Sequence, residues 1–409
     1  MNVSWPWKSA NQVVRVGLIL ATLVAMISLG QGIRNALRPT GSQDFQWGPS
    51  RALLHRFDPY ALKIRQYAHP DEPAPFLFSQ DPTYPISAYV FLWPYAALPW
   101  PMAKLLWALS NVGFMVVLVW GLGRLFLQSE MKWIWWLAGC LFVIGTPLRN
   151  LIGNGQHALF SLSFFVLALY CLEQEKPMWS GVCLALALLK YTVTLPLLIV
   201  FLLKRSYRPL WVAMALHLAL LMFASLWTQV TPLQLVREYG QVVMVETHQG
   251  IDGYVDINAV LHHLGLSAVP FLWPTLAAVL LLTAALVMFW YGTGQELRCL
   301  AVLSLLSAVV VYHRPYDMVV LAFALFYVLA QSRSHWHDRT VLLFGLCVLL
   351  TWFVEKPVFL LQMRSTDPFA QGVVSIYQWF VVALVYTALV CGFATVYLRR
   401  SRSIVLPQP

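Results

Sequence analysis

Long apolar windows separated by shorter polar segments run through most of the chain. A helix needs roughly 20 apolar residues to cross the hydrocarbon core of a bilayer. The windows that reach this length are residues 13–33, 103–127, 209–229, 268–291 and 373–398. The shorter windows that are also predicted to be spans are residues 133–148, 157–172, 299–312, 315–331 and 341–354. The pattern predicts an all-α polytopic membrane protein with about 12 transmembrane helices, built as a single integral membrane domain over residues 1–409.

Two further stretches decide how the chain is threaded through the membrane. Residues 86–98 are apolar but short and rich in proline, and residues 179–203 are long but interrupted by Lys190 and a proline. In one arrangement each stretch is a single span. In the other, 86–98 lies along the outer surface and 179–203 forms a hairpin of two short helices with Lys190 at the outer turn. We favour the second arrangement because it places Arg124 and Lys132 on the cytoplasmic side, together with the basic residues of both termini.

The composition supports this class and excludes a soluble domain. Hydrophobic residues make up 59% of the chain and charged residues 11%, and the mean hydropathy is +0.67. These values leave too little polar surface to cover a soluble protein of 409 residues. The net charge of +10 is spread between the apolar windows and forms no single basic, aromatic face, so anionic lipid is the expected partner and nucleic acid is not.

The favoured topology places both termini in the cytoplasm and gathers the polar motifs on the outer face. A first extracytoplasmic loop at 34–102 is predicted to carry juxtamembrane helices and the catalytic group, and a second large loop lies at 230–267. A protein with its chemistry on one side is more typical of an enzyme than of a carrier, which presents its site to both sides. The first loop also holds basic residues on the wrong side for the usual bias, namely Arg34, Arg38, Arg51, Arg56, Lys63 and Arg65. Either they bind phosphate headgroups, or a loop this long is translocated regardless of its charge.

Lys190 is the strongest candidate for an anion ligand on physical grounds. A charged group inside an apolar stretch costs several kcal/mol unless it reaches water or an anion, and is functional by default. The alternative is a lysine whose ammonium group reaches the membrane surface. Lys190 lies far from either end of 179–203, and this position favours a functional role.

Two carboxylates of the first loop compete for the role of general base. Asp44 lies just past the first apolar window, where a carboxylate at the mouth of a helical bundle could take a proton from a substrate. The structural alternative for Asp44 is an N-cap of a helix over 45–56. Asp58 is followed by Pro59 and Tyr60, a composition typical of a turn, which favours a structural role.

The order of several motifs resembles glycosyltransferase family 87. After the N-terminal apolar window and Asp44 come Phe57-Asp58-Pro59-Tyr60, Asn154-Gly155-Gln156, Leu189-Lys190-Tyr191 and Asp256-Ile257-Asn258. The resemblance extends over roughly residues 13–330. That family uses polyprenyl-phosphate sugars and belongs to the GT-C superfamily, which includes bacterial mannosyltransferases. The resemblance implies a GT-C-like helical bundle in a bacterial inner membrane.

The resemblance also implies a mechanism and a set of site residues. An acceptor hydroxyl attacks the anomeric carbon of a hexose with inversion as polyprenyl phosphate leaves, Asp44 takes the hydroxyl proton, and cations stabilise the phosphate. The implied ligands of the donor phosphate are Lys190, His313 and Arg314. The implied substrate-binding residues are Asp58, Tyr60, Asn154, Gln156, Asn258 and Asp317. Asp317 is expected to orient His313 or to pair with Arg314, and a purely structural salt bridge is the alternative.

We expect no cofactor and no protein-bound metal. Whether a divalent cation bridges the donor phosphate is left open. The acidic and histidine residues of 230–267 do not have the spacing of a standard metal site. The expected partners are a polyprenyl-phosphate sugar donor, a glycolipid or glycan acceptor, and membrane lipids. The main alternative function is a lipid-linked sugar transporter or flippase, which would also need basic residues in an apolar bundle. A transferase with a diphosphate-lipid donor is a second alternative.

Overall fold

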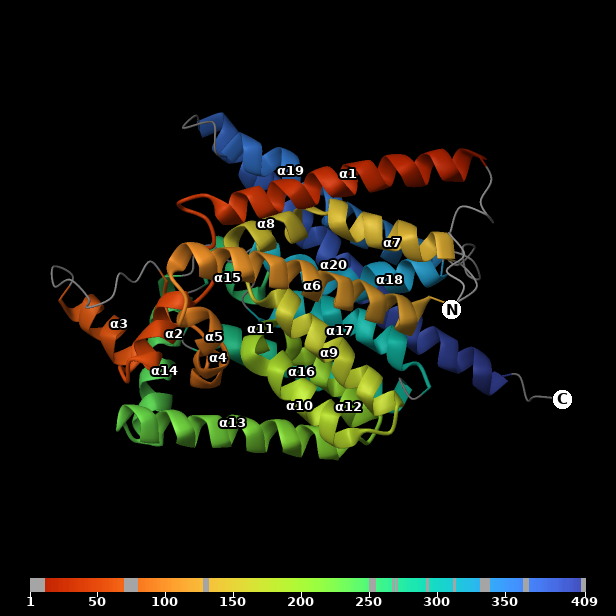
Figure 1. Cartoon of the computed structure of the whole chain (residues 1–409). Coiled ribbons are helices and arrows are strands. Elements are labelled where there is room, and N and C mark those ends of the chain that lie inside the picture. Colours follow the sequence, from red (N-terminus) through yellow and green to blue (C-terminus); the bar gives the residue numbers. More distant parts are fainter. Residues whose placement is uncertain are drawn as a thin grey trace.

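The computed structural model describes residues 12–69, 80–127, 132–249, 255–266, 269, 271–291, 294–311, 314–331, 339–362 and 368–405. Every regular element in these residues is a helix (Figure 1). The first half contains α1 (Gln12–Leu37), α2 (Trp47–Leu54), α3 (Pro59–Ala68), α4 (Ile86–Phe91), α5 (Trp93–Ala96), α6 (Trp100–Phe126), α7 (Lys132–Ile144), α8 (Thr146–Asn154), α9 (Ala158–Glu173) and α10 (Pro177–Ala187). The second half contains η2 (Leu188–Lys190), α11 (Tyr191–Thr194), η3 (Pro196–Leu198), α12 (Ile199–Leu203), α13 (Tyr207–Thr228), α14 (Pro232–Gln249), α15 (Ile257–His263), α16 (Leu272–Tyr291), α17 (Glu296–Val310), η4 (Pro315–Leu321), α18 (Ala322–Gln331), α19 (Arg339–Gln362) and α20 (Pro368–Val405).

The long apolar windows of the sequence form helices of membrane-spanning length. Within the described residues, five helices are long and apolar enough to cross a membrane: α1, α6, α13, α16 and the Trp379–Tyr397 part of α20. Helices α7 and α8 meet the same criterion together but are bent by 57° where they join, which would make a sixth span. The five long windows are therefore confirmed as helices in a multi-pass membrane protein, and a total of about 12 spans stays a prediction.

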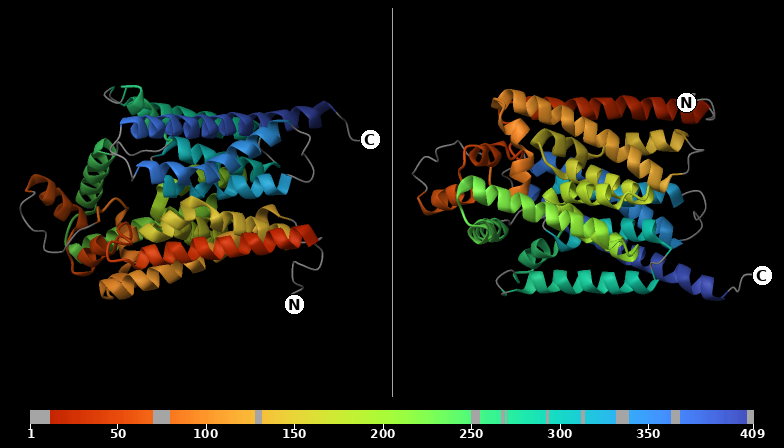
Figure 2. Two further views of the ribbon diagram at one scale, coloured as in Figure 1. Left: turned by 90° about the horizontal axis from the view of Figure 1, so that it is seen from above. Right: turned by 60° about the horizontal axis from the view of Figure 1, so that its bottom comes forward.

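The helices form one bundle with a polar cap at one end. Helix α1 begins and α20 ends at the same end of the bundle, and the short helices α2 to α5 lie with α14 at the opposite end (Figures 1 and 2). At the centre, α17 is buried from Arg298 to Val310. The guanidinium of Arg298 is satisfied there, because it donates to the Tyr327 hydroxyl at 2.7 Å, to the Gln295 side chain at 3.0 Å and to the Thr395 carbonyl at 2.6 Å.

Neither of the two ambiguous stretches is one continuous helix. Residues 86–98 form the short helices α4 and α5, and 179–203 is broken into α10, η2, α11, η3 and α12. The break lies at Lys190, whose φ of −115° and ψ of 72° leave the helical region, and Pro196 opens the next 3-10 turn because it cannot continue the hydrogen-bond pattern of a preceding helix. The interruption predicted for 179–203 is confirmed, and the membrane crossings of both stretches stay predictions.

A pair of carboxyl groups connects α3 to α14 at the polar end. Asp58 is the N-cap of α3, and its Oδ1 accepts hydrogen bonds from the amides of Tyr60 at 2.9 Å and Ala61 at 3.4 Å. Its Oδ2 and the Oε2 of Glu238 in α14 are both buried without a hydrogen-bond donor, and a proton shared between the two neighbouring carboxyl groups would satisfy both oxygens. Burial raises the pKa of Asp58 to about 7, and the neighbouring carboxyl group of Glu238 acts in the same direction. Asp58 therefore retains a proton at pH values where an exposed aspartate is ionised.

This pair predicts a stability that falls as the pH rises. The ordinary pKa of Asp58 is 3.8, so between about pH 4 and pH 7 the native state binds a proton that the unfolded state has released. One such proton lowers the free energy of unfolding by up to about 1.4 kcal/mol for each pH unit gained in this window. Glu238→Gln removes the acidic partner and should flatten the dependence, because Asp58 then ionises at a lower pH in the native state. The measurement is the melting temperature of the detergent-solubilised protein, followed by tryptophan fluorescence between pH 5 and pH 8.

The matched control is Glu173→Gln, which removes the carboxylate of an exposed glutamate in the last turn of α9. The control should keep the pH dependence of the unsubstituted protein. Equal pH dependence in Glu238→Gln and in the control would show that Asp58 and Glu238 share no proton.

Candidate functional site

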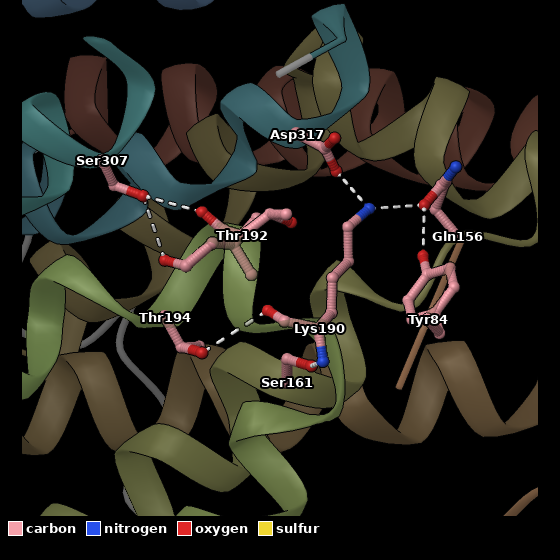
Figure 3. Close-up of polar contacts among 9 residues, drawn as sticks. Tyr84, Gln156, Ser161, Lys190, Thr192, Thr194, Ser307 and Asp317 are labelled. Atoms are coloured by element: carbon pink, nitrogen blue, oxygen red, sulfur yellow. Dashed lines mark hydrogen bonds and ion pairs between the residues drawn. The ribbon is translucent and has the colours of Figure 1, made fainter. Parts of the chain in front are cut away.

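Lys190 is buried at the break between α10 and α11, and its ammonium group is the centre of a polar cluster inside the bundle. Its Nζ donates to Gln156 Oε1 at 2.5 Å and to Asp317 Oδ1 at 2.5 Å (Figure 3). The ring centroids of Tyr84 and Tyr316 lie 5.9 and 5.6 Å from the same nitrogen. An ammonium group has three N–H donors, so one donor remains beyond those used by Gln156 and Asp317.

The backbone break that presents Lys190 is held in place by neighbouring hydroxyls. The Lys190 amide donates to Ser161 Oγ at 3.2 Å, and Thr194 Oγ1 donates to the Ala187 and Lys190 carbonyl oxygens at 3.1 and 3.4 Å. On the other side, Ser307 Oγ lies 3.3 and 3.2 Å from the carbonyl oxygens of residues 192 and 193 (Figure 3). These side chains satisfy carbonyl groups that a broken helix would otherwise leave without partners inside the bundle.

Asp317 reaches Lys190 from η4, which packs against α8 and α9. The sequence led us to expect that Asp317 orients His313 or pairs with Arg314, and the structure shows an ion pair between Asp317 and Lys190. The pair forms because η4 and the break at η2 both lie against α9, although the two residues are 127 positions apart in the chain. His313 lies outside the described residues, and Arg314 immediately precedes η4 with a half-buried side chain.

Asp44 lies in the turn between α1 and α2, and this turn is hydrogen-bonded to the end of α8. The amide of Asp44 donates to the Asn154 carbonyl oxygen at 3.0 Å, and the amide of Ser42 donates to the Gly153 carbonyl oxygen at 3.1 Å. Gly155 closes α8 with a φ of 71°, a conformation that favours glycine. A Cβ at this position would lie 3.0 Å from Ser42 Cβ, so the turn packs directly on the glycine. The Asn154-Gly155-Gln156 motif thus positions the loop that carries Asp44.

The alternative N-cap role for Asp44 is wrong. Helix α2 begins at Trp47, its N-cap is Gln46 in the left-handed region, and no side chain caps it. The two residues between Asp44 and Trp47 separate the carboxylate from the first turn of the helix. Asp44 is half-buried and its side chain is directed to other groups.

The electrostatic surroundings of Asp44 connect it to the Lys190 cluster. Burial raises the pKa of the Asp44 carboxyl group, and Asp317 adds to the increase. The neighbouring Gln156 amide and the positive charges of Arg314 and Lys190 oppose it. A carboxylate with raised proton affinity beside two cations is suited to accept a proton while a neighbouring anion forms.

Tyr84 is a member of the cluster that sequence reasoning missed. Its hydroxyl donates to Gln156 Oε1 at 3.1 Å, so this oxygen accepts from both Tyr84 and Lys190 (Figure 3). The ring of Tyr84 lies 4.9 Å from that of His157, which is buried and lines a small aromatic cavity with Tyr95 and Trp107. Tyr84 lies just before Pro85, the N-cap of α4, and such a position outside a helix carries no periodic signal that would have identified it.

The remaining residues expected to bind substrate lie in different positions. Asn154 is exposed, and it contacts the Asp44 amide through its backbone. Tyr60 is buried and donates from its hydroxyl to the Tyr84 carbonyl oxygen at 2.7 Å. The carboxyl group of Asp58 caps the N-terminus of α3 and neighbours Glu238. Asn258 is half-buried on α15, and no hydrogen bond joins it to the cluster within the described residues. The structure therefore brings together Asp44, Gln156, Lys190, Arg314 and Asp317.

The described residues contain no group of three or more His, Cys, Asp and Glu side chains that could hold a metal ion. Part of the 230–267 loop lies outside those residues. Independence of a protein-bound metal therefore stays a prediction.

Comparison with known proteins gives one match. The model of glycosyltransferase family 87 matches residues 83–315, which is more than half of the chain. The matched region contains Tyr84, Gln156, Lys190 and Arg314, and Asp44 precedes it. No curated protein and no solved structure matches the chain. The chain belongs to glycosyltransferase family 87 and is a membrane glycosyltransferase.

Proposed function

We propose that the protein transfers a hexose from a polyprenyl-phosphate sugar to a hydroxyl group of a lipid-linked or envelope glycan acceptor. Mannose is the first sugar to test, because the resemblance of the sequence extends to bacterial mannosyltransferases. The reaction would take place at the extracytoplasmic face of a bacterial inner membrane, with both termini in the cytoplasm. This orientation fits a bundle in which α1 begins at the end opposite to α2 and the Asp44 turn (Figure 1).

The observation that supports this proposal is the position of Asp44 beside Gln156, within the field of Lys190 and Arg314. In the proposed reaction the acceptor oxygen attacks the anomeric carbon, its bond to the sugar forms with inversion, and the bond from that carbon to the phosphate oxygen breaks. The hydroxyl proton passes to the Asp44 carboxylate, and the electron pair of the broken bond stays on polyprenyl phosphate. Lys190 and Arg314 stabilise the added negative charge.

His313 remains a proposed further ligand of the phosphate. For Lys190, the third N–H of the ammonium group is available to a phosphate oxygen while Gln156 and Asp317 occupy the other two. Lys190 would then bind the donor without losing the contacts that keep it charged inside the bundle. Asp317 would hold the ammonium group in place in this arrangement, and Gln156 would connect it to the base.

The proposed base predicts a large loss of transfer in Asp44→Asn. The amide is close in size to the carboxylate but cannot accept the proton, so the transfer rate should fall by about 10²- to 10⁴-fold while donor binding is retained. The measurement is incorporation of label from radiolabelled polyprenyl-phosphate mannose into a membrane lipid extract by the purified protein in nanodiscs. Asp81→Asn is the matched control, because Asp81 is an acid of the same loop that pairs with Lys63.

Two results would contradict parts of this proposal. Transfer by Asp44→Asn with loss of transfer in Asp58→Asn would make Asp58 the base. The absence of labelled product with every monophosphate donor tested would exclude this donor class. Movement of the labelled donor across a vesicle membrane without transfer would then favour the flippase.

The ion pair between Lys190 and Asp317 allows a second test, which separates a structural role from phosphate binding. Lys190→Met leaves Asp317 as a buried charge without its partner, and breaking such a pair costs roughly 3–5 kcal/mol of stability. Adding Asp317→Asn removes that charge, so the double variant should regain most of the melting temperature. If Lys190 binds the donor phosphate, the double variant should stay inactive, and Asp317→Asn alone should retain donor binding.

The measurements are the melting temperature and the labelled-transfer assay on the three variants. Recovery of transfer together with stability in the Lys190→Met, Asp317→Asn double variant would show that Lys190 is needed only for folding.

A further inference from the structure

His157 is a buried imidazole that has no hydrogen-bond partner. It is 4% exposed, and within the described residues neither of its ring nitrogens is hydrogen-bonded. His217 shows the usual arrangement, since its Nδ1 lies 2.8 Å from Ser87 Oγ and its Nε2 lies 3.0 Å from the Ala185 carbonyl oxygen. Leaving a buried polar group unpaired costs stability. A partner for His157 that arrives with a ligand would recover this cost.

His157 lines the small aromatic cavity beside the Lys190 cluster. The cavity has a volume of about 30 Å³. Since one water molecule needs about 10–15 Å³ measured in this way, the cavity admits a group of about two non-hydrogen atoms. Its walls include Trp107, Phe160 and Leu189, and the ring centroid of Trp107 lies 4.7 Å from that of His157. The cavity therefore combines an apolar wall with one unpaired polar side chain.

The other polar side chains of the cavity wall already have partners. These partners are Gln156 Oε1 for Tyr84 at 3.1 Å, Ser110 Oγ for Tyr95 at 2.9 Å and the Gly155 carbonyl oxygen for Trp107 at 2.7 Å. A water molecule in the cavity would find His157 as its one free side-chain partner in the described part of the wall. Buried water usually makes roughly three hydrogen bonds. A group that is half apolar and half polar suits the cavity better than water.

The cavity borders the residues that are proposed to bind the donor phosphate. Leu189 lines it and directly precedes Lys190 in the chain. The ring centroid of Tyr84 lies 4.9 Å from that of His157 and 5.9 Å from Lys190 Nζ (Figure 3). The ring of Phe45, which follows Asp44, lies 6.2 Å from the ring of His157. A sugar whose phosphate is held by Lys190 would thus have its ring close to this cavity.

We propose that the cavity takes the hydroxymethyl group of the donor hexose and that His157 binds its hydroxyl. The methylene carbon would pack against the aromatic wall. A hydroxyl both donates and accepts, so it can pair with a ring nitrogen in either tautomer of the imidazole. An isoprenoid chain would leave His157 unpaired. This inference rests on the proposed function, because the donor sugar is the source of the hydroxymethyl group.

The experiment compares two radiolabelled donors, polyprenyl-phosphate mannose and its 6-deoxy counterpart, which has a methyl group in place of the hydroxymethyl group. Their equilibrium binding is measured on the purified protein in nanodiscs, without acceptor. The unsubstituted protein should bind the mannose donor roughly 10- to 100-fold more tightly. In His157→Phe the preference should fall below about threefold through weaker binding of the mannose donor alone. His157→Gln retains a hydrogen-bonding group and should recover part of the preference.

His217→Phe is the matched control, because it is the same substitution at a histidine that does not line the cavity. It should keep the preference of the unsubstituted protein. The melting temperatures without ligand should differ in the opposite sense. His217→Phe removes two contacts and should melt at a lower temperature, whereas His157→Phe removes unpaired nitrogens and should melt at the same or a higher temperature.

The outcomes separate this inference from the proposed function. Equal binding of the two donors by the unsubstituted protein, or an unchanged preference in His157→Phe, would overturn the proposed subsite. An equal loss of affinity for both donors in His157→Phe would also overturn it, because a purely structural histidine gives that result. If the preference is found but neither donor gives labelled product with acceptor, His157 recognises the hydroxymethyl group and the proposed transfer fails. Absence of binding by either donor would overturn both.

Discussion

The requirement to satisfy the buried ammonium group of Lys190 organises the polar interior of this bundle. A charge at this depth is costly unless it is paired and hydrogen-bonded. Its two partners come from distant parts of the chain: Gln156 follows α8, and Asp317 lies in η4. The need to bring both to Lys190 explains why three interruptions of regular helix meet at one place: the junction of α8 and α9, the break at η2 and the 3-10 turn η4. In an apolar bundle without this charge, each interruption would only expose backbone groups that have no partner.

The same junction also positions the first loop. Gly155 ends α8 in the left-handed region, and the Asp44 turn packs on it through backbone hydrogen bonds to residues 153 and 154. Gln156, the next residue, accepts hydrogen bonds from Lys190 and Tyr84, and its side chain neighbours Asp44. A displacement of α8 would therefore move the carboxylate, the amide and the ammonium group together. This common support is a physical reason for the motif to combine a glycine that permits a tight turn with a polar side chain directly after it.

The sequence predicted those parts of the fold that depend on local physical constraints. The long apolar windows predicted the long helices, since length and composition alone decide whether a helix can span a bilayer. The cost of a buried charge identified Lys190 as a residue that needs polar partners. These inferences needed no knowledge of how the helices pack.

Pairings between distant residues could not be predicted in the same way. Lys190 and Asp317 are 127 residues apart, and nothing in either local pattern indicates which acid pairs with which base. The proximity of Asp58 and Glu238 was missed for the same reason, since the local pattern at Asp58 indicates only a turn. Tyr84 became visible only when its hydroxyl was located next to Gln156.

The charges of the site also bear on the order of events in the proposed reaction. Before the donor binds, Lys190 and Arg314 face Asp44 and Asp317, so the cationic and anionic side chains are equal in number. A bound phosphate adds negative charge, and more develops on it as the bond to the sugar breaks. Since a nearby negative charge raises the proton affinity of a carboxylate, Asp44 becomes a stronger base as the leaving group forms. Proton transfer from the acceptor would thus be favoured most when the anomeric carbon is most open to attack. Lys190 restrains this effect, because its positive charge lowers the proton affinity of Asp44.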